Sequence, residues 1–99
     1  MVKLVALYKK PADVAVFEKH YQEIHTPLAK KMPGLKKLEV GHFTGAPGGE
    51  PKFYMMAELY FDTKEAMMSA LGSPEGKAAA KDVMSFAGDL IHMMFADVA

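Results

Sequence analysis

Hydrophobic and polar positions alternate in a pattern that divides the chain into strands and helices. Runs of apolar, β-branched and aromatic residues predict strands over residues 2–8, 36–44, 53–61 and 90–98. An apolar face that recurs at helical spacing predicts a helix that is N-capped by Asp13 and runs to about His25. Pro27 is expected to stop or kink this helix, with Thr26 capping a short second segment that ends at Pro33–Gly34.

A second helical region is predicted between the third and fourth strands. Asp62 is the expected N-cap, with Glu65 three positions later as in a capping box. Gly72 closes this helix, and Ser73–Pro74 opens another that runs to about Ala87. The order strand, helix, strand, strand, helix, strand predicts an α+β ferredoxin-like βαββαβ sandwich, with the helices on one face of an antiparallel sheet. We expect residues 1–99 to form a single domain of this kind.

The predicted strands carry large apolar side chains on both faces, so the face without helices also needs a cover. In the strand 53–61 one set of alternate positions is wholly apolar and is assigned to the helix side: Phe53, Met55, Ala57, Leu59 and Phe61. The other set is assigned to a subunit interface: Tyr54, Met56, Glu58 and Tyr60. Leaving about eight apolar side chains in water would forfeit on the order of 20 kcal/mol, more than the whole stability of a typical domain. A second copy of the chain is therefore predicted to cover this face, which makes the protein a homodimer. Lys3 is assigned to the opposite side from Glu58, whose expected partner is a Tyr hydroxyl or a basic group of the second subunit.

Composition and charge exclude several classes of function. Twelve Lys and Arg balance twelve Asp and Glu, and a chain of zero net charge argues against nucleic acid and acidic membranes as partners. The absence of Cys excludes a disulfide scaffold, a thiolate nucleophile and Cys-ligated metals. No apolar run is long enough to span a membrane and the first residues lack the pattern of a signal peptide, so we expect a soluble cytoplasmic protein. Metal-ligand, dinucleotide-binding and P-loop motifs are missing, and no metal or cofactor is expected.

Two histidines are the candidate catalytic groups. His25 lies within the apolar face of the first predicted helix and near its C-terminus, where a histidine can act as an acid or a base near neutral pH. His92 alternates with Leu90 and Met94 and is assigned to the same space between helix and sheet. The alternative for each is a structural histidine in the core or at the rim of a pocket.

The remaining candidate pocket residues are aromatic or apolar. Tyr21 precedes His25 by one helical turn, and the expected apolar walls of the substrate site are Phe17, Val5, Leu7, Met55 and Ala57. His20 is five residues from His25, which on a regular helix places the two about 140° apart. His20 is therefore expected on a solvated face and unable to share a metal with His25, and His42 is given no more than a rim role.

The run Phe17-Glu18-Lys19-His20-Tyr21-Gln22-Glu23-Ile24-His25-Thr26-Pro27-Leu28-Ala29, followed by Met32-Pro33-Gly34-Leu35, resembles the EthD family. This family takes its name from a gene cluster for ethyl tert-butyl ether degradation and belongs to the dimeric α+β barrel superfamily. The resemblance implies two ferredoxin-like sheets that meet face to face, and a pocket in each subunit between the sheet and its own helices. It does not assign an activity.

Three functions follow as hypotheses. The first is a cofactor-independent oxidation, isomerisation or ring closure of a small apolar metabolite, with His25 or His92 moving a proton; it requires a cavity of about 300 Å³ or more beside a histidine. The alternative is a non-catalytic binding or accessory protein of an oxygenase or degradation pathway. A third, haem binding as in distant superfamily members, requires a histidine over a large open pocket.

Overall fold

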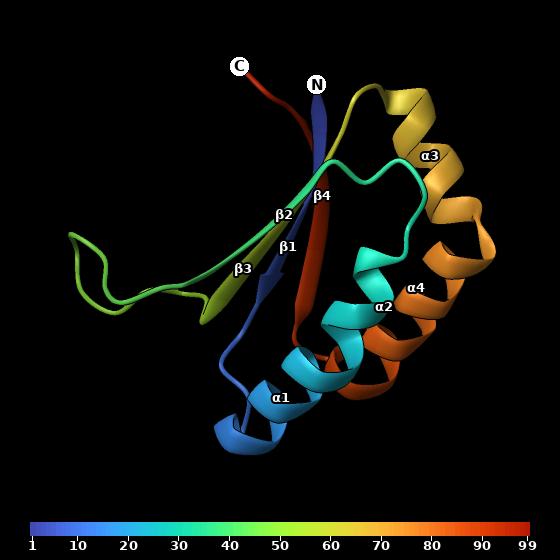
Figure 1. The fold of residues 1–99 in the computed structure, drawn as a ribbon. Coiled ribbons are helices and arrows are strands. Elements are labelled where there is room, and N and C mark those ends of the chain that lie inside the picture. The colour runs from blue at the N-terminus through green and yellow to red at the C-terminus, as the bar shows by residue number, and fades with distance from the viewer.

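The computed structural model describes all 99 residues and contains one four-stranded antiparallel sheet. In chain order the elements are β1 (Val2–Tyr8), α1 (Val14–His20), η1 (Tyr21–His25), α2 (Thr26–Lys30), β2 (Lys37–His42), β3 (Met55–Phe61), α3 (Lys64–Gly72), α4 (Pro74–Ala87) and β4 (Ile91–Asp97). The strands lie in the order β2-β3-β1-β4. All helices lie on one side of the sheet and the other face is left uncovered (Figure 1). The predicted ferredoxin-like fold is confirmed.

The register between strands shows which side chains face the helices. Alternate residues of β1 lie opposite alternate residues of β3, and the following six are all buried: Leu4, Ala6, Tyr8, Leu59, Ala57 and Met55. The Tyr8 ring packs edge-on against the rings of Phe17 and Tyr21, with ring centroids 5.6 and 5.8 Å apart. This side of the sheet is therefore the helix face, and we call the opposite side the open face. Met55 and Ala57 lie on the helix face, as expected from the sequence.

Val5, Leu7 and His92 lie on the open face, so their assignment to the helix side was wrong. His92 of β4 is opposite Leu7 of β1, and Ile91 is opposite the buried Tyr8. Since side chains alternate along a strand, the burial of Tyr8 sends Leu7 and Val5 to the other side together with His92. His92 and His25 are consequently separated by the sheet and do not form a pair.

Lys3 and Glu58 also share the open face, where their side chains form an ion pair of 2.6 Å. The expectation that Glu58 would need a Tyr hydroxyl or a group of another subunit was therefore wrong. Tyr60 lies on this face as predicted, and its hydroxyl donates to Glu39 at 2.9 Å. This bond is the main cause of the lowered pKa of Glu39 and the raised pKa of Tyr60.

The residues just before β3 depart from the predicted alternation. The strand begins at Met55 rather than at Phe53. The Tyr54 ring lies 6.1 Å from that of Phe17 on the helix face, whereas the Phe53 ring lies 5.7 Å from that of His92. The sides predicted for these two aromatic residues are thus reversed, because the regular pleat does not extend past Met55.

The helix starts show how local hydrogen bonds define each boundary. Asp13 caps α1 as predicted, since its carboxylate accepts from the Val16 N–H at 3.1 Å. Ser73 caps α4 in the same way, at 3.0 Å from the Gly76 nitrogen. Thr63 rather than Asp62 caps α3, because its hydroxyl accepts from the Ala66 N–H.

None of the helices is long and apolar enough to cross a membrane.

A stop or a kink was expected near His25, and the first helical run does not stop there. It continues in right-handed helical conformation through η1 into α2, and Thr26 is part of the run instead of its cap. The Thr26 N–H donates to the carbonyl of Tyr21, five residues earlier, so η1 is a single wide π-helical turn. This turn lies directly before Pro27, whose missing N–H interrupts the regular ladder in any case.

Candidate functional site

The buried centre of the molecule contains a carboxylate that is shared by two histidines. Asp82 of α4 accepts a hydrogen bond from His20 Nε2 at 2.9 Å and one from His25 Nδ1 at 3.1 Å, one on each of its oxygens. The side chains of His25 and Asp82 are 10% and 13% exposed, and that of His20 is 32% exposed. The cluster therefore leads from the core to the surface.

The π-helical turn is what brings the two histidines together. On a regular helix residues 20 and 25 would point about 140° apart, but a turn closed by a bond to the fifth residue is wider and reduces the angle between positions five apart. The prediction that His20 faces solvent on its own was wrong for this reason. π-turns are frequent at functional sites, and here the turn places both imidazoles on one carboxylate.

Asp82 was missed by sequence reasoning, because a single acidic residue on an amphipathic helix is usually solvated. The signal that was available is its position beside the buried stripe of α4. Val83 follows it directly, and Phe86 lies one turn later with its ring against both histidines, at 4.2 Å from His20 and 5.6 Å from His25. An acid at the edge of such a stripe, with histidines on the facing helix, indicates a buried partner.

Burial and hydrogen bonding determine the protonation state of His25. Burial lowers the pKa of His25 below its ordinary value of 6.5, although the hydrogen bond and the charge of Asp82 oppose that shift. The imidazole is therefore neutral at pH 7, and the bond to Asp82 assigns its proton to Nδ1. Nε2 makes no hydrogen bond, yet no buried side-chain nitrogen or oxygen lacks a partner, so Nε2 is in contact with accessible space. His25 thus has the arrangement of an oriented general base.

A partly open cavity of about 60 Å³ lies next to His25, between the helices and the sheet. Tyr21 and Ala57 line it, as predicted, and most of its other lining residues are hydrophobic. Burial raises the pKa of Tyr21 to about 12, so its phenol stays protonated and able to donate. Phe17 and Met55 are buried but do not line this cavity. The volume is well below the 300 Å³ or so that the enzyme hypothesis required.

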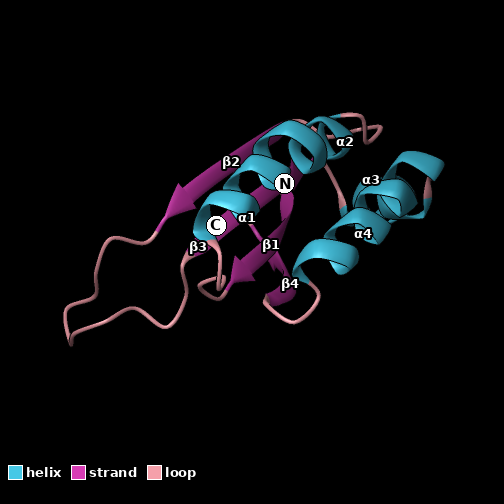
Figure 2. Ribbon diagram, turned by 90° about the horizontal axis from the view of Figure 1, so that it is seen from below, coloured by secondary structure: helices cyan, strands magenta, loops and turns pink.

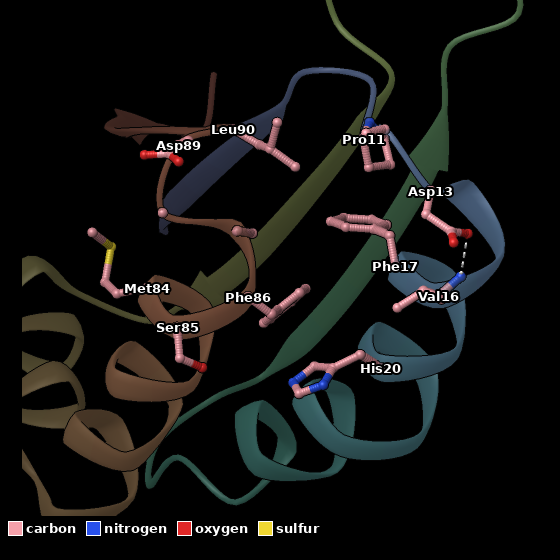
Figure 3. A pocket seen from close by; sticks show the side chains of 13 residues that line it. Pro11, Asp13, Val16, Phe17, His20, Met84, Ser85, Phe86, Asp89 and Leu90 are labelled. Carbon is pink, nitrogen blue, oxygen red and sulfur yellow. Dashed lines mark hydrogen bonds between the residues drawn. The ribbon is translucent and has the colours of Figure 1, made fainter.

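A larger groove of about 430 Å³ lies on the other side of the His20–Phe86 contact. It runs between the start of α1 and the end of α4, and Figure 3 shows Phe17, Phe86 and His20 directed toward it. The cavity and the groove share no lining residue. Phe86, which contacts both histidines, lines the groove only.

A second polar cluster fastens α1 to the sheet. Glu18 accepts hydrogen bonds from the Tyr54 hydroxyl at 2.8 Å and from His42 Nε2 at 3.1 Å. Desolvation raises the pKa of Glu18, but these bonds outweigh it and leave the pKa below its ordinary value. Desolvation, followed by the bond to Glu18, raises the pKa of Tyr54 to about 12. His42 therefore does more than line a rim, because it helps to hold the helix against β2 and β3.

Neither cluster is arranged as a metal centre, since no group of three or more His, Cys, Asp or Glu side chains is placed to hold an ion. In the His20–Asp82–His25 cluster both carboxylate oxygens already accept from an imidazole. The space beside His25 is also far smaller than a porphyrin, so this cavity does not fit a haem group.

The fold and the paired histidines define a ferredoxin-like α+β protein with a histidine–aspartate cluster under its first helix. A model of the EthD domain matches residues 9–89, most of the chain. The protein belongs to the EthD family, as its histidine-containing motif had suggested.

Two relatives match over essentially the whole chain. One is an EthD family protein from Bacillus halodurans, whose crystal structure has a TM-score of 0.96 and 45% sequence identity, with 100% of this chain and 99% of that chain covered. The other is an uncharacterized 11.0 kDa protein in the thcB-thcC intergenic region of Rhodococcus erythropolis, 38% identical over 98% of this chain and 94% of that protein. A dimeric ferredoxin-like protein of unknown function from Thermobifida fusca shares the fold, with a TM-score of 0.72 and 15% identity over 98% of this chain and 90% of that one.

Proposed function

We propose that the protein acts on a small, mostly apolar molecule beside His25 and moves a proton without a cofactor. The observation that carries this proposal is the pairing of His25 Nδ1 with Asp82 at 3.1 Å, which leaves the neutral Nε2 without a partner on a residue that lines an apolar cavity. Nε2 accepts a proton from the ligand, and the Asp82 carboxylate stabilises the imidazolium that forms. Tyr21, whose ring lies 5.4 Å from that of His25, supplies a neutral hydroxyl to the same cavity. Isomerisation and ring closure both begin with such a proton transfer.

The volume of the cavity restricts the ligand. A space of about 60 Å³ accepts a ligand of only a few non-hydrogen atoms unless lining side chains move. Met32 and Met93 are among the lining residues, and Met93 is exposed on β4. Since methionine side chains are flexible, a change of their rotamers makes room for a somewhat larger ligand. The small volume is also the observation that favours the second candidate, a binding or accessory protein without turnover.

Solvent deuterium exchange tests the proposed chemistry with probes of suitable size. Acetone and hydroxyacetone lose C–H protons to a general base, and NMR in D₂O follows the loss. We expect the wild-type protein to accelerate this exchange beyond free imidazole at equal concentration, and His25→Gln to abolish the excess. His92→Gln is the matched control, because His92 lies behind the sheet and should leave the rate unchanged. Equal rates for wild type and His25→Gln would refute the catalytic role and leave the binding role.

The open face is the proposed site of a second copy. This uncovered sheet face carries apolar side chains around the ion pair of Lys3 and Glu58. The apolar residues are Val5, Leu7, Met56 and Met94. The dimeric state of the ferredoxin-like neighbour from Thermobifida fusca supports this arrangement.

Sedimentation equilibrium tests the dimer. We expect a particle of twice 10.9 kDa for the wild type and for Met68→Lys, which changes an exposed methionine of α3. Val5→Lys should give the single-chain mass, because the added charge would be buried in the interface without a partner. A stable single-chain particle of wild-type protein at micromolar concentration would rule the dimer out.

A further inference from the structure

The groove between α1 and α4 has the dimensions of a ligand site in its own right. Its volume of about 430 Å³ lies within the roughly 300–1,000 Å³ typical of small-molecule pockets, whereas the cavity beside His25 does not. In Figure 2 the start of α1 and the end of α4 are splayed apart. The groove occupies this opening.

Aromatic rings form a continuous surface on one side of the groove. Phe17 and Phe86 have ring centroids 5.5 Å apart, and the His20 ring lies 4.2 Å from Phe86 with its plane tilted by 32°. Figure 3 shows these three rings side by side, with Phe17 and His20 on α1 and Phe86 on α4. Since Phe17 and Phe86 already contact each other, a guest lies on their exposed edges and faces rather than between them. Such a surface favours aromatic ligands, because a pair of aromatic rings gains interaction free energy in addition to that from the area it buries.

The charges around the groove select among aromatic guests. Its thirteen lining residues include Asp13 and Asp89 but no Lys or Arg. One oxygen of Asp13 already accepts from the Val16 N–H, whereas Asp89 is exposed and forms no hydrogen bond or ion pair in the structure. Figure 3 shows both carboxylates at the rim and directed away from the three rings, so the rim disfavours an anion and offers a cation or a hydroxyl an available acceptor in Asp89.

We propose that this groove binds an aromatic molecule that carries a protonated amine or another hydrogen-bond donor. The ring lies against Phe17, Phe86 and His20, and the donor reaches Asp89 at the rim. His25 does not line the groove, so this second site does not depend on the proton transfer proposed above.

Three probes with the same ring and different charge test the proposal on the intact protein. Benzylamine, benzyl alcohol and benzoate are titrated at neutral pH, with the methyl NMR signals of Val16 and Met84 as reporters, since both residues line the groove. We expect saturable shifts in roughly the millimolar range for benzylamine, as suits a ligand of this size. Benzyl alcohol should bind more weakly, and benzoate should bind least. Absence of saturable shifts with benzylamine, or equal binding of benzoate, would overturn the proposal.

A positive charge added at the wall of the groove provides the variant, and the same change outside the groove provides its matched control. Val16→Lys puts an ammonium group at a lining position that is 64% exposed, and Ile24→Lys does the same at a position 48% exposed and outside the groove. Val16→Lys should weaken benzylamine about fivefold and strengthen benzoate, as expected for one added charge a few ångströms away in water. Ile24→Lys should change both affinities by less than about twofold, since salt screens a distant charge. Equal effects of the two lysines would contradict the assignment.

His25→Gln separates this proposal from the catalytic one. Benzylamine should bind the variant as it binds the wild type, whether or not deuterium exchange is lost. Loss of benzylamine binding in His25→Gln would show that the probe occupies the inner cavity, and would overturn a separate site in the groove.

Discussion

Asp82→Asn is the substitution that tests the site most directly. Asn keeps the shape of the side chain but loses the charge, and its amide presents one acceptor and one donor in place of two acceptors. His20 and His25 both donate to Asp82, so with the present tautomers one of the two bonds must fail and a largely buried polar group loses its partner. An imidazole regains a bond to the amide only by moving its proton to the other ring nitrogen. A loss of this kind costs about 1–3 kcal/mol of unfolding free energy. For a domain of this size that corresponds to a fall in Tm of roughly 5–20 °C.

The same substitution should move the pKa of His25 in a defined direction. Burial lowers this pKa, and the hydrogen bond and charge of Asp82 partly compensate. Removing the charge leaves burial unopposed, so the pKa of His25 should fall further. The preference for a proton on Nδ1 should weaken at the same time, because its acceptor is no longer fixed.

Long-range ¹H–¹⁵N NMR of the histidine rings measures both quantities in one pH titration. Wild type should show a neutral His25 with the Nδ1–H tautomer, and Asp82→Asn should show a lower pKa and mixed tautomers. Asp89→Asn is the control, since Asp89 is exposed and bonds to neither histidine. An unchanged or raised pKa of His25 in Asp82→Asn, or an unchanged Tm, would mean that Asp82 does not orient this histidine.

Three further predictions concern stability. The free energy of unfolding should decrease as the pH falls below about 6.5, because His25 has a lowered pKa in the folded chain and is protonated first in the unfolded chain. Denaturant titrations at several pH values should show a weaker pH dependence for His25→Gln than for the wild type. Gly76→Ala should destabilise by about 1–3 kcal/mol, since a Cβ at Gly76 would collide with the backbone carbonyls of Ala70 and Leu71, while Gly72→Ala has free space and should be tolerated in thermal melts. Thr63→Ala should cost about 1 kcal/mol by removing the N-cap of α3, and a larger loss from Asp62→Ala in chemical denaturation would show that the cap has been assigned to the wrong residue.

Local patterns in the sequence were sufficient for the elements and their order. Asp13 and Ser73 were recognisable as caps because an N-cap needs only a short polar side chain next to a helical run. His25 was recognisable because it is a titratable group within an apolar face. The family motif around it pointed to the fold and to a pocket beneath the first helix.

Long-range geometry decided the rest of the site. The side of the sheet occupied by His92 depends on its register with Leu7, which no local pattern specifies. The meeting of His20 and His25 depends on one wide turn, and a change in the hydrogen-bond ladder leaves no periodic trace in so short a segment.

The sequence by itself determined a ferredoxin-like sheet with apolar side chains on both faces and a histidine beneath its first helix. Only the tertiary structure placed Asp82 between His20 and His25, because a carboxylate more than fifty residues away becomes their partner only when α4 packs against the first helical run. Contacts of this kind depend on how whole elements are oriented, whereas strands and helices are encoded by the spacing of neighbouring residues.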